Sequence, residues 1–392
     1  MTANWKRARL GDVAAIVRDI ISPENIADGT SFVGLENIPT GGGFHNVRPV
    51  MNGDIQSAKF AFTELHVLYG KLRPYLAKIS LPDFKGVCST DILPVLPGKE
   101  LDRRFLAHYL LQPSMVDKAN SLATGANLPR LSPGALEDLE LPLAPIDEQR
   151  RIADILDRAD ALRAKRRAAL ARLDELTQAI FIEMFGDPVS NPKGWPTTAV
   201  LGDVADIVSG VTKGRNLEGK TTRTLPYLAV ANVQDKKLNL AAIKSIEATE
   251  DEIRRYRLMK NDLLLTEGGD PDKLGRGTLW QDELPECIHQ NHIFRVRLNT
   301  DRVNSLFLNW LVGSERGKRY FLRSAKQTTG IASINMTQLR GFPLLLPPTA
   351  LQNTFANCIA GIERVKSRHS AAQFEVDGLF ASLQDRAFRG AL

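Results

Sequence analysis

The chain has 392 residues, of which 43% are apolar and 24% charged, and its formal net charge is +6. This length allows two or three domains, and the basic excess mildly favours an acidic partner such as nucleic acid. No stretch approaches the ~18 consecutive apolar residues of a membrane helix, and the N-terminus carries no apolar signal core. We therefore expect a cytoplasmic protein that does not bind a membrane.

Residues that commonly bind metals or form disulfides are scattered. Cys88, Cys287 and Cys358 form no C-x-x-C pair, and three thiols cannot all be paired, so we expect reduced, mostly buried cysteines. His289 and His292 share one apolar run, but a spacing of three places them on opposite faces of a strand, and no third ligand is evident. No metal site is predicted.

Residues 1–145 alternate short apolar runs with clusters of Gly, Pro and Asn. Runs such as F-V-G-L-E-N-I and D-I-L-P-V-L indicate strands, and residues 102–122 indicate a pair of helices. No dinucleotide fingerprint and no parallel βαβ rhythm is apparent. We expect a strand-rich α+β domain that closes with helices.

A long helix is predicted over residues 146–186, directly after Pro145. Apolar residues recur there at alternating steps of three and four, which is the pattern of a heptad seam. At ~1.5 Å per residue a helix of this length spans roughly 60 Å. Its apolar stripe needs a partner, whereas its many charges off the seam suit a solvated face.

The second half of the chain repeats the first. L-G-D-V-A starts at Leu10 and again at Leu201, each after a tryptophan. Residues 187–349 repeat the strand-rich pattern, with a second helical pair over 303–325, and residues 350–392 form a second long helix. Adding 203 to each apolar seam position of the first helix gives an apolar residue in the second. The predicted seam consists of Ile152, Ile155, Leu162, Leu173, Leu176 and Ile180, with Phe355, Ile362, Val365, Val376, Leu379 and Leu383.

This duplication predicts the architecture. Each helix is the obvious partner of the other, and similar surroundings for both domains require the helices to pack antiparallel. We expect an α+β protein in which two tandem domains are separated by two long antiparallel coiled-coil helices, as a dumbbell with a pseudo-twofold axis.

The octapeptide G-R-N-L-E-G-K-T at 214–221 fits the P-loop expression G-x-x-x-x-G-K-[ST]. A P-loop needs a helix immediately after it, so that the helix N-terminus and loop amides hold the phosphates. Here Pro226 and a strand-like run follow, and the first repeat has no counterpart. We interpret the segment as a basic, glycine-rich loop.

Other catalytic signatures are missing from the sequence. There is no N-P-P-[YF] tetrapeptide for amino-group methylation, no glycine-rich turn for S-adenosylmethionine, and no E-x-K soon after the P-D pairs. No Ser/His/Asp order can be defended. We predict no catalytic residue in this chain.

Loops rich in Lys, Arg, Asn, Gln, Thr and Gly occupy equivalent places in both halves. Arg and Lys can reach guanine, Asn and Gln can bind adenine, and phosphates accept hydrogen bonds from all of these. The predicted DNA contacts are Lys71, Arg73, Tyr75, Asn127 and Arg130 in the first half, and Lys213, Arg215, Lys273, Arg276, Lys326, Gln327 and Asn335 in the second.

Several of these segments resemble a known family. L-P-L-A-P-I-D-E-Q-R-R-I at 141–152, F-G-D-P at 185–188, G-W at 194–195 and both copies of L-G-D-V-A are typical of specificity subunits of type I restriction-modification systems. The resemblance covers essentially the whole chain. The second helix departs from the pattern, since A-L-Q-N-T-F replaces Pro-x-x-Glu-Gln and Gln352 takes the place of Gln149.

The resemblance implies two target-recognition domains that each read half of a split double-stranded DNA sequence, with the helices as spacer. It also implies two methyltransferase (modification) subunits docked on the helices, and restriction subunits that translocate and cleave DNA. S-adenosylmethionine, ATP and magnesium are then expected in those partners, and no cofactor in this chain. Because the repeat offset grows from 191 to 202 within the domains, their loops differ, and we predict an asymmetric, interrupted target.

Two other classes stay open at this point. A duplicated coiled-coil scaffold that binds proteins but not DNA would carry the same repeat. An enzyme, either a P-loop NTPase or a self-sufficient methyltransferase, would need the motifs rejected above.

Overall fold

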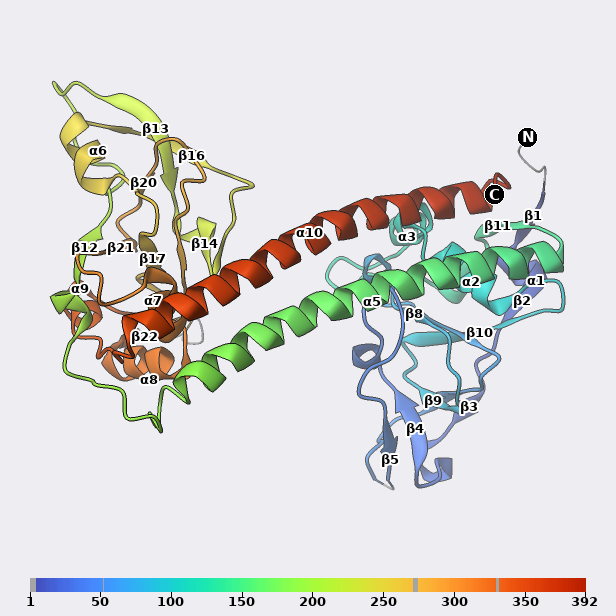
Figure 1. Cartoon of the computed structure of the whole chain (residues 1–392). Coiled ribbons are helices and arrows are strands. Elements are labelled where there is room, and N and C mark those ends of the chain that lie inside the picture. Colours follow the sequence, from blue (N-terminus) through green and yellow to red (C-terminus); the bar gives the residue numbers. More distant parts are fainter. Residues whose placement is uncertain (1–4, 52, 271–273, 329–330) are drawn as a thin grey trace. The chain divides into compact units, whose positions relative to one another are not determined.

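The structure, a computed structural model, describes residues 5–51, 53–270, 274–328 and 331–392. It divides into two compact units (Figure 1). Unit 1 comprises residues 1–169 and 369–392, and unit 2 comprises residues 170–368. Each unit therefore holds one strand-rich domain together with one end of each long helix.

Unit 1 contains three sheets. Their strands are β1 (Lys6–Arg9), β2 (Ala14–Ile16), β3 (Ile20–Ile21), β4 (Thr30–Val33), β5 (Arg48–Val50), β6 (Lys59–Phe62), β7 (Val67–Gly70), β8 (Ile79–Ser80), β9 (Gly86–Cys88), β10 (Ile92–Pro97) and β11 (Glu140–Leu143). The sheet orders are β2-β10-β7-β8, β3-β6-β9-β4-β5 and β1-β11. All pairs are antiparallel except β4 with β9. The short helices are α1 (Leu10–Val13), α2 (Arg103–Leu110), α3 (Pro113–Ser121) and α4 (Pro133–Glu137).

Unit 2 repeats this plan. Its strands are β12 (Ala205–Ser209), β13 (Arg223–Leu228), β14 (Val233–Gln234), β15 (Lys237–Leu238), β16 (Lys244–Ala248), β17 (Leu263–Thr266), β18 (Gly268–Gly269), β19 (Gly277–Leu279), β20 (Ile288–His289), β21 (Ile293–Leu298), β22 (Lys326–Thr328) and β23 (Ile331–Ser333). The sheet orders are β12-β21-β17-β19, β16-β13-β20, β14-β15 and β18-β23-β22. Its short helices are α6 (Glu250–Tyr256), α7 (Ser305–Val312), α8 (Glu315–Ser324) and α9 (Met336–Arg340).

The duplication is confirmed at the level of strand register. In unit 1, Ile92 of β10 lies opposite Gly70 of β7. In unit 2, Ile293 of β21 lies opposite Thr266 of β17. Each unit also has one parallel pair at the matching place, β4 with β9 and β13 with β20. The α+β fold class is confirmed, as are both predicted helical pairs, now α2 with α3 and α7 with α8.

The two long helices are α5 (Ile146–Phe185) and α10 (Thr349–Phe388). In unit 1 the start of α5 and the end of α10 lie on α2 and α3 (Figure 1), where the rings of Phe105 and Phe388 pack at a tilt with centroids 4.9 Å apart. In unit 2 the end of α5 meets the start of α10, and Phe181 lies 5.6 Å from Phe355. The helices therefore run antiparallel, as predicted.

A buried glutamine fixes the start of each long helix. Gln149 accepts a hydrogen bond from the amide of Asp102, at 2.8 Å, and donates to the carbonyl oxygens of Glu100 and Ala144. Gln352 makes the matching three bonds in unit 2, to the amide of Asn304 and to two carbonyl oxygens. Asp102 and Asn304 in turn cap the N-termini of α2 and α7. The substitution around Gln352 thus keeps the group that joins helix and domain.

The predicted heptad seam is wrong at four of its twelve residues. The predicted residues Leu162, Leu176, Val365 and Leu379 are exposed, as is Cys358, whereas the others are buried or half-buried. The inner face of α5, the face that is buried or half-buried, consists of residues 152, 156, 159, 163, 166, 170, 173, 177 and 181. At every second step this series lies one residue later than the predicted seam. Adding 203 gives the inner face of α10, with His369 its one exposed member. Packing of Leu156 into the core of unit 1 and ion pairs at Arg163 and Lys366 set this phase.

Four further features are the segment that resembles a P-loop, the cysteines, metal-binding groups and membrane spans. The segment that resembles a P-loop runs into β13 and not into a helix, so it lacks the geometry of a phosphate site. Cys88, Cys287 and Cys358 are free; the first two are buried and Cys358 is exposed, so the thiols are mostly buried, as expected. Among the described residues, no group of three or more His, Cys, Asp and Glu side chains could hold a metal ion. No helix in the described part of the chain is both long and apolar enough to span a membrane.

Candidate nucleic-acid interface

Two of the predicted basic loops of unit 1 are joined by main-chain hydrogen bonds. The loop that follows β7 meets the segment 123–131, where the amide of Arg73 donates to the carbonyl oxygen of Pro129 at 2.7 Å. The amide of Leu131 donates to the carbonyl oxygen of Lys71 at 2.9 Å. The predicted contacts Lys71, Arg73, Tyr75, Asn127 and Arg130 therefore lie on one joined pair of loops, which we call loop pair 1.

The side chains of loop pair 1 suit a partner outside the chain. Arg73, Tyr75, Asn127 and Arg130 are exposed. Arg73 adopts a left-handed backbone conformation, with φ of 51°, which costs free energy for a residue with a side chain. Within the described residues its guanidinium forms no ion pair, so it can serve a phosphate or a base edge.

One acidic residue, missed in the sequence, organises the cations of loop pair 1. The carboxylate of Asp91 accepts a hydrogen bond from Nε of Arg130 at 3.2 Å and lies 3.9 Å from Nζ of Lys71. Asp91 precedes β10 by one residue, and Lys71 follows β7 by one residue. Only the register of these two strands brings them together, so sequence spacing gave no signal.

Unit 2 joins its equivalent loops in the same way. Gly268 and Gly269 of β18 pair with β23, and β23 pairs with β22, so these three strands form one small sheet. The amide of Ile334 donates to the carbonyl oxygen of Glu267 at 2.9 Å, which matches the bond from Leu131 to Lys71. We call this arrangement loop pair 2. The pairing of loops at equivalent places in the two halves agrees with the sequence prediction.

The structure describes only some of the side chains predicted to contact DNA in unit 2. Lys273 lies outside the described residues, as do the side chains of Lys326 and Gln327, although the last two belong to β22 by their backbone. Lys213 is exposed beside Tyr227, with Nζ 5.6 Å from the ring centroid. It is the one described residue of the unit 2 set that still suits a DNA contact.

Three predicted DNA contacts of unit 2 make hydrogen bonds within the chain. Arg215 makes two hydrogen bonds to the carboxylate of Glu252, which lower the pKa of that carboxyl group. Arg276 is half-buried and donates to Oε1 of Gln234 at 3.2 Å. Asn335 caps α9, where its side chain accepts from the amide of Gln338. The sequence pattern could not separate these internal bonds from contacts with a partner.

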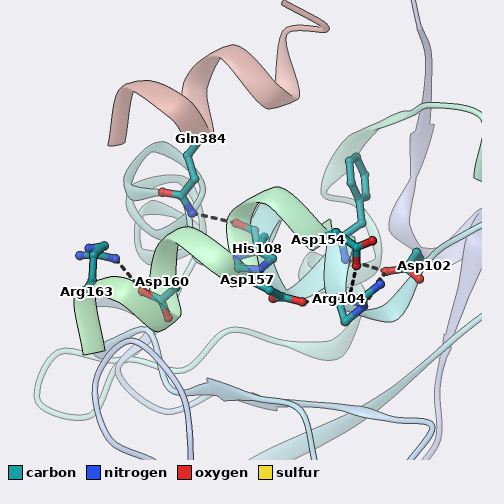
Figure 2. Close-up of polar contacts among 9 residues, drawn as sticks. Asp102, Arg104, His108, Asp154, Asp157, Asp160, Arg163 and Gln384 are labelled. Carbon is teal, nitrogen blue, oxygen red and sulfur yellow. Dashed lines mark hydrogen bonds and ion pairs between the residues drawn. The ribbon is translucent and has the colours of Figure 1, made fainter. Parts of the chain in front are cut away.

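The strand-rich domain of unit 1 is held to α5 by a polar junction (Figure 2). Nε2 of His108 lies 2.7 Å from Oδ1 of Asp157, and Arg104 bonds to Asp154 and Asp157 at 2.7 and 3.0 Å. The hydrogen bond from His108, aided by Arg104, lowers the pKa of the Asp157 carboxyl group. Nε2 of Gln384 on α10 also donates to the carbonyl oxygen of His108. Both long helices thereby contact α2.

Comparison with known proteins agrees with this geometry. Residues 3–172 match the family described as "Type I restriction modification DNA specificity domain". The type I restriction enzyme StySPI specificity subunit of Salmonella potsdam is 24% identical over 312 residues, which cover 76% of this chain and 67% of that protein. The EcoDI specificity subunit of Escherichia coli is 28% identical over 212 residues, 53% of this chain and 46% of that protein.

Residues 3–172 thus carry a DNA specificity domain of the type I restriction-modification kind, and most of the chain is similar to specificity subunits of such systems. Two solved structures share its fold. One, titled as the structural basis of complex assembly and conformational transition of the type I R-M system, has a TM-score of 0.59 at 19% identity, with both chains covered completely. The S subunit from M. genitalium has a TM-score of 0.56 at 15% identity, covering 98% of this chain and 96% of that chain.

The family domain matched at residues 3–172 covers the first reading domain and the first part of α5. Unit 2 has the same kind of domain as unit 1, because its strand register, its buried glutamine and its loop pair have direct counterparts in unit 1. The two loop pairs are the candidate DNA-binding sites of this chain.

Proposed function

We propose that this chain is a specificity subunit that binds double-stranded DNA, and that each unit reads one half of an asymmetric, interrupted target. The observation that carries the proposal is the joined pair of polar loops at the same place in both units. The loops present donors and acceptors that can contact base edges and phosphates. Their sequences differ between the units, so two identical half-sites would not satisfy both.

The proposal assigns the chemistry to other subunits. Two modification subunits would bind S-adenosylmethionine and methylate adenine, while restriction subunits would use ATP and magnesium to translocate and cleave DNA. This chain would contribute the choice of site. The absence of methyltransferase and nuclease motifs from the sequence supports this division.

The test is to express this chain with its modification subunit in a host that lacks other adenine methylation, and to sequence the modified bases. We expect one methylated motif made of two unlike parts separated by unspecified bases. A single symmetric, uninterrupted motif would contradict the bipartite reading. A duplicated scaffold that binds proteins but not DNA would yield no motif, and the assembled complex would show no saturable, salt-dependent binding to any duplex.

A further inference from the structure

The two loop pairs have the same main-chain hydrogen bonds where they leave their sheets. We call this set of hydrogen bonds the frame of each loop pair. In unit 1 the amide of Lys71 donates to the carbonyl oxygen of Asp91 at 2.9 Å, and in unit 2 the amide of Glu267 donates to the carbonyl oxygen of His292 at 3.0 Å. Each frame is closed by the bond from the second loop, Leu131 to Lys71 or Ile334 to Glu267. Because main-chain atoms make these bonds, the side chains at the frame can differ without moving the loops.

The side chains at these equivalent positions differ: where one unit has an acidic residue, the other has a lysine or a histidine. Lys71 in unit 1 corresponds to Glu267 in unit 2, and Asp91 corresponds to His292. The pair Lys71–Asp91 spans 3.9 Å, and Nδ1 of His292 lies 2.6 Å from Oε2 of Glu267. In unit 2 the acidic residue, Glu267, directly follows β17, which is the counterpart of β7. In unit 1 the acidic residue, Asp91, directly precedes β10.

The third position of the frame differs as well. Arg130 in unit 1 is bonded to Asp91 and corresponds to Ser333 in unit 2, which ends β23 and directly precedes Ile334. The frame of unit 1 therefore carries two cations and one acid, whereas that of unit 2 carries one acid, one histidine and a hydroxyl. Every one of these side chains is exposed or half-buried, so each can reach a bound partner.

The charges decide which part of DNA each frame suits. A carboxylate repels phosphate, but it accepts hydrogen bonds from the amino groups of cytosine and adenine in the major groove. Lys and Arg donate to O6 and N7 of guanine. We infer that Glu267 and His292 of unit 2, and Lys71, Asp91 and Arg130 of unit 1, are specificity-determining positions. The frame of unit 2 binds cytosine or adenine through the amino group in the major groove, and the frame of unit 1 binds guanine.

This inference rests on the proposed function and is tested by exchanging the frames. The double variant Glu267→Lys with His292→Asp gives unit 2 the pair found in unit 1. It would be expressed with the modification subunit, and the methylated motif compared with that of the unaltered chain. We expect preference at one position of one half-site to shift from cytosine or adenine toward guanine by about tenfold or more, since a well-placed pair discriminates about 5- to 150-fold. The other half-site stays unchanged.

The reciprocal variant, Lys71→Glu with Asp91→His, should alter only the opposite half-site. The matched control exchanges Asp251 and Arg254, an exposed ion pair on α6, and should leave both half-sites unchanged. An unchanged motif in the double variants would overturn the inference, whether it is methylated fully or weakly. Weaker methylation of the same motif would mean that the exchanged residues support the loops and do not select a base.

Two further readouts keep the outcomes separate. If a double variant does not fold, Glu267→Gln removes the charge at nearly constant size, and an unchanged motif in that variant would also overturn the inference. If the unaltered chain directs no methylated motif at all, the proposed function itself fails, and that result is visible before any variant is made.

Discussion

Nε of Arg163 on α5 lies 2.6 Å from Oδ1 of Asp377 on α10, inside unit 1. The positions 203 residues away repeat the contact in unit 2, where Nζ of Lys366 lies 2.7 Å from Asp174. Asp160, three residues before Arg163, bonds it too, just as Glu363 bonds Lys366. Each end of the helix pair therefore places one cation at an inner position and holds it between two acids.

Exchanging the charges of the first pair should show a measurable coupling. Arg163→Asp and Asp377→Arg each bring like charges together at a half-buried position, so each should lower the free energy of unfolding by about 1–2 kcal/mol. The double exchange restores opposite charges and should recover part of the loss, but not the contact of Arg163 with the ring of Phe380 at 4.2 Å. Urea unfolding of the four proteins measures the coupling. Strictly additive losses would show that the pair contributes nothing.

The phase of the helix seam can be tested with two leucines six residues apart. Leu156 is fully buried, whereas Leu162 is 60% exposed. Leu156→Ala removes core packing and should cost about 2–5 kcal/mol, while Leu162→Ala should cost less than about 0.5 kcal/mol. Chemical denaturation followed by circular dichroism compares the two. Equal losses would favour the heptad phase predicted from the sequence.

The buried glutamines should matter for stability at both helix starts. Gln149→Ala leaves a buried amide and two carbonyl groups without their partner, so we expect a loss of about 2–4 kcal/mol. Gln352→Ala serves as the matched variant in unit 2 and should behave alike, because it makes the same three bonds. Thermal unfolding checks both. A small effect of either change would mean that water replaces the side chain without cost.

The junction in Figure 2 predicts a pH dependence. The folded-state pKa of Asp157 lies below its ordinary value of 3.8, so its contribution to stability is present above that value and is lost as the pH falls through the lower folded-state pKa. Asp157→Asn should therefore cost about 1 kcal/mol near pH 6, a modest figure because the side chain is 40% exposed. The difference from the unaltered chain should shrink below about pH 4.

Unfolding experiments at several pH values test this expectation. Asp147→Asn provides the control, since that side chain is 92% exposed and should show no comparable difference at any pH. A cost of Asp157→Asn that persisted undiminished at pH 3 would mean that packing, and not the charge, is what the variant loses.

The internal repeat made most of the fold predictable from the sequence, but it did not predict the partners of individual side chains at the candidate site. Duplicated patterns revealed both domains, the helical pairs and the antiparallel helices, because apolar spacing and Gly-Asp-Val turns leave a trace in sequence. The heptad phase failed because Leu162 and Leu379 look like core residues, whereas the inner places go to Arg163 and Phe380. The partners of Arg215 and Asn335 depend on strand register and helix capping, and the roles of Asp91 and Glu267 emerge only when the two frames are compared.

A pair of arginines separates DNA contact from structural support. Arg73 is exposed on loop pair 1, and Arg215 is tied to Glu252. In the complex with modification subunits, Arg73→Ala should weaken binding to the methylated motif's duplex about 5- to 10-fold and, if it contacts a phosphate, reduce the salt dependence by about one ion. Arg215→Ala should leave affinity within about twofold and lower stability by about 1 kcal/mol. Fluorescence anisotropy at several salt concentrations measures both. Unchanged affinity in Arg73→Ala would remove loop pair 1 from the interface, because this exposed cation, which forms no ion pair among the described residues, would then make no contact with DNA.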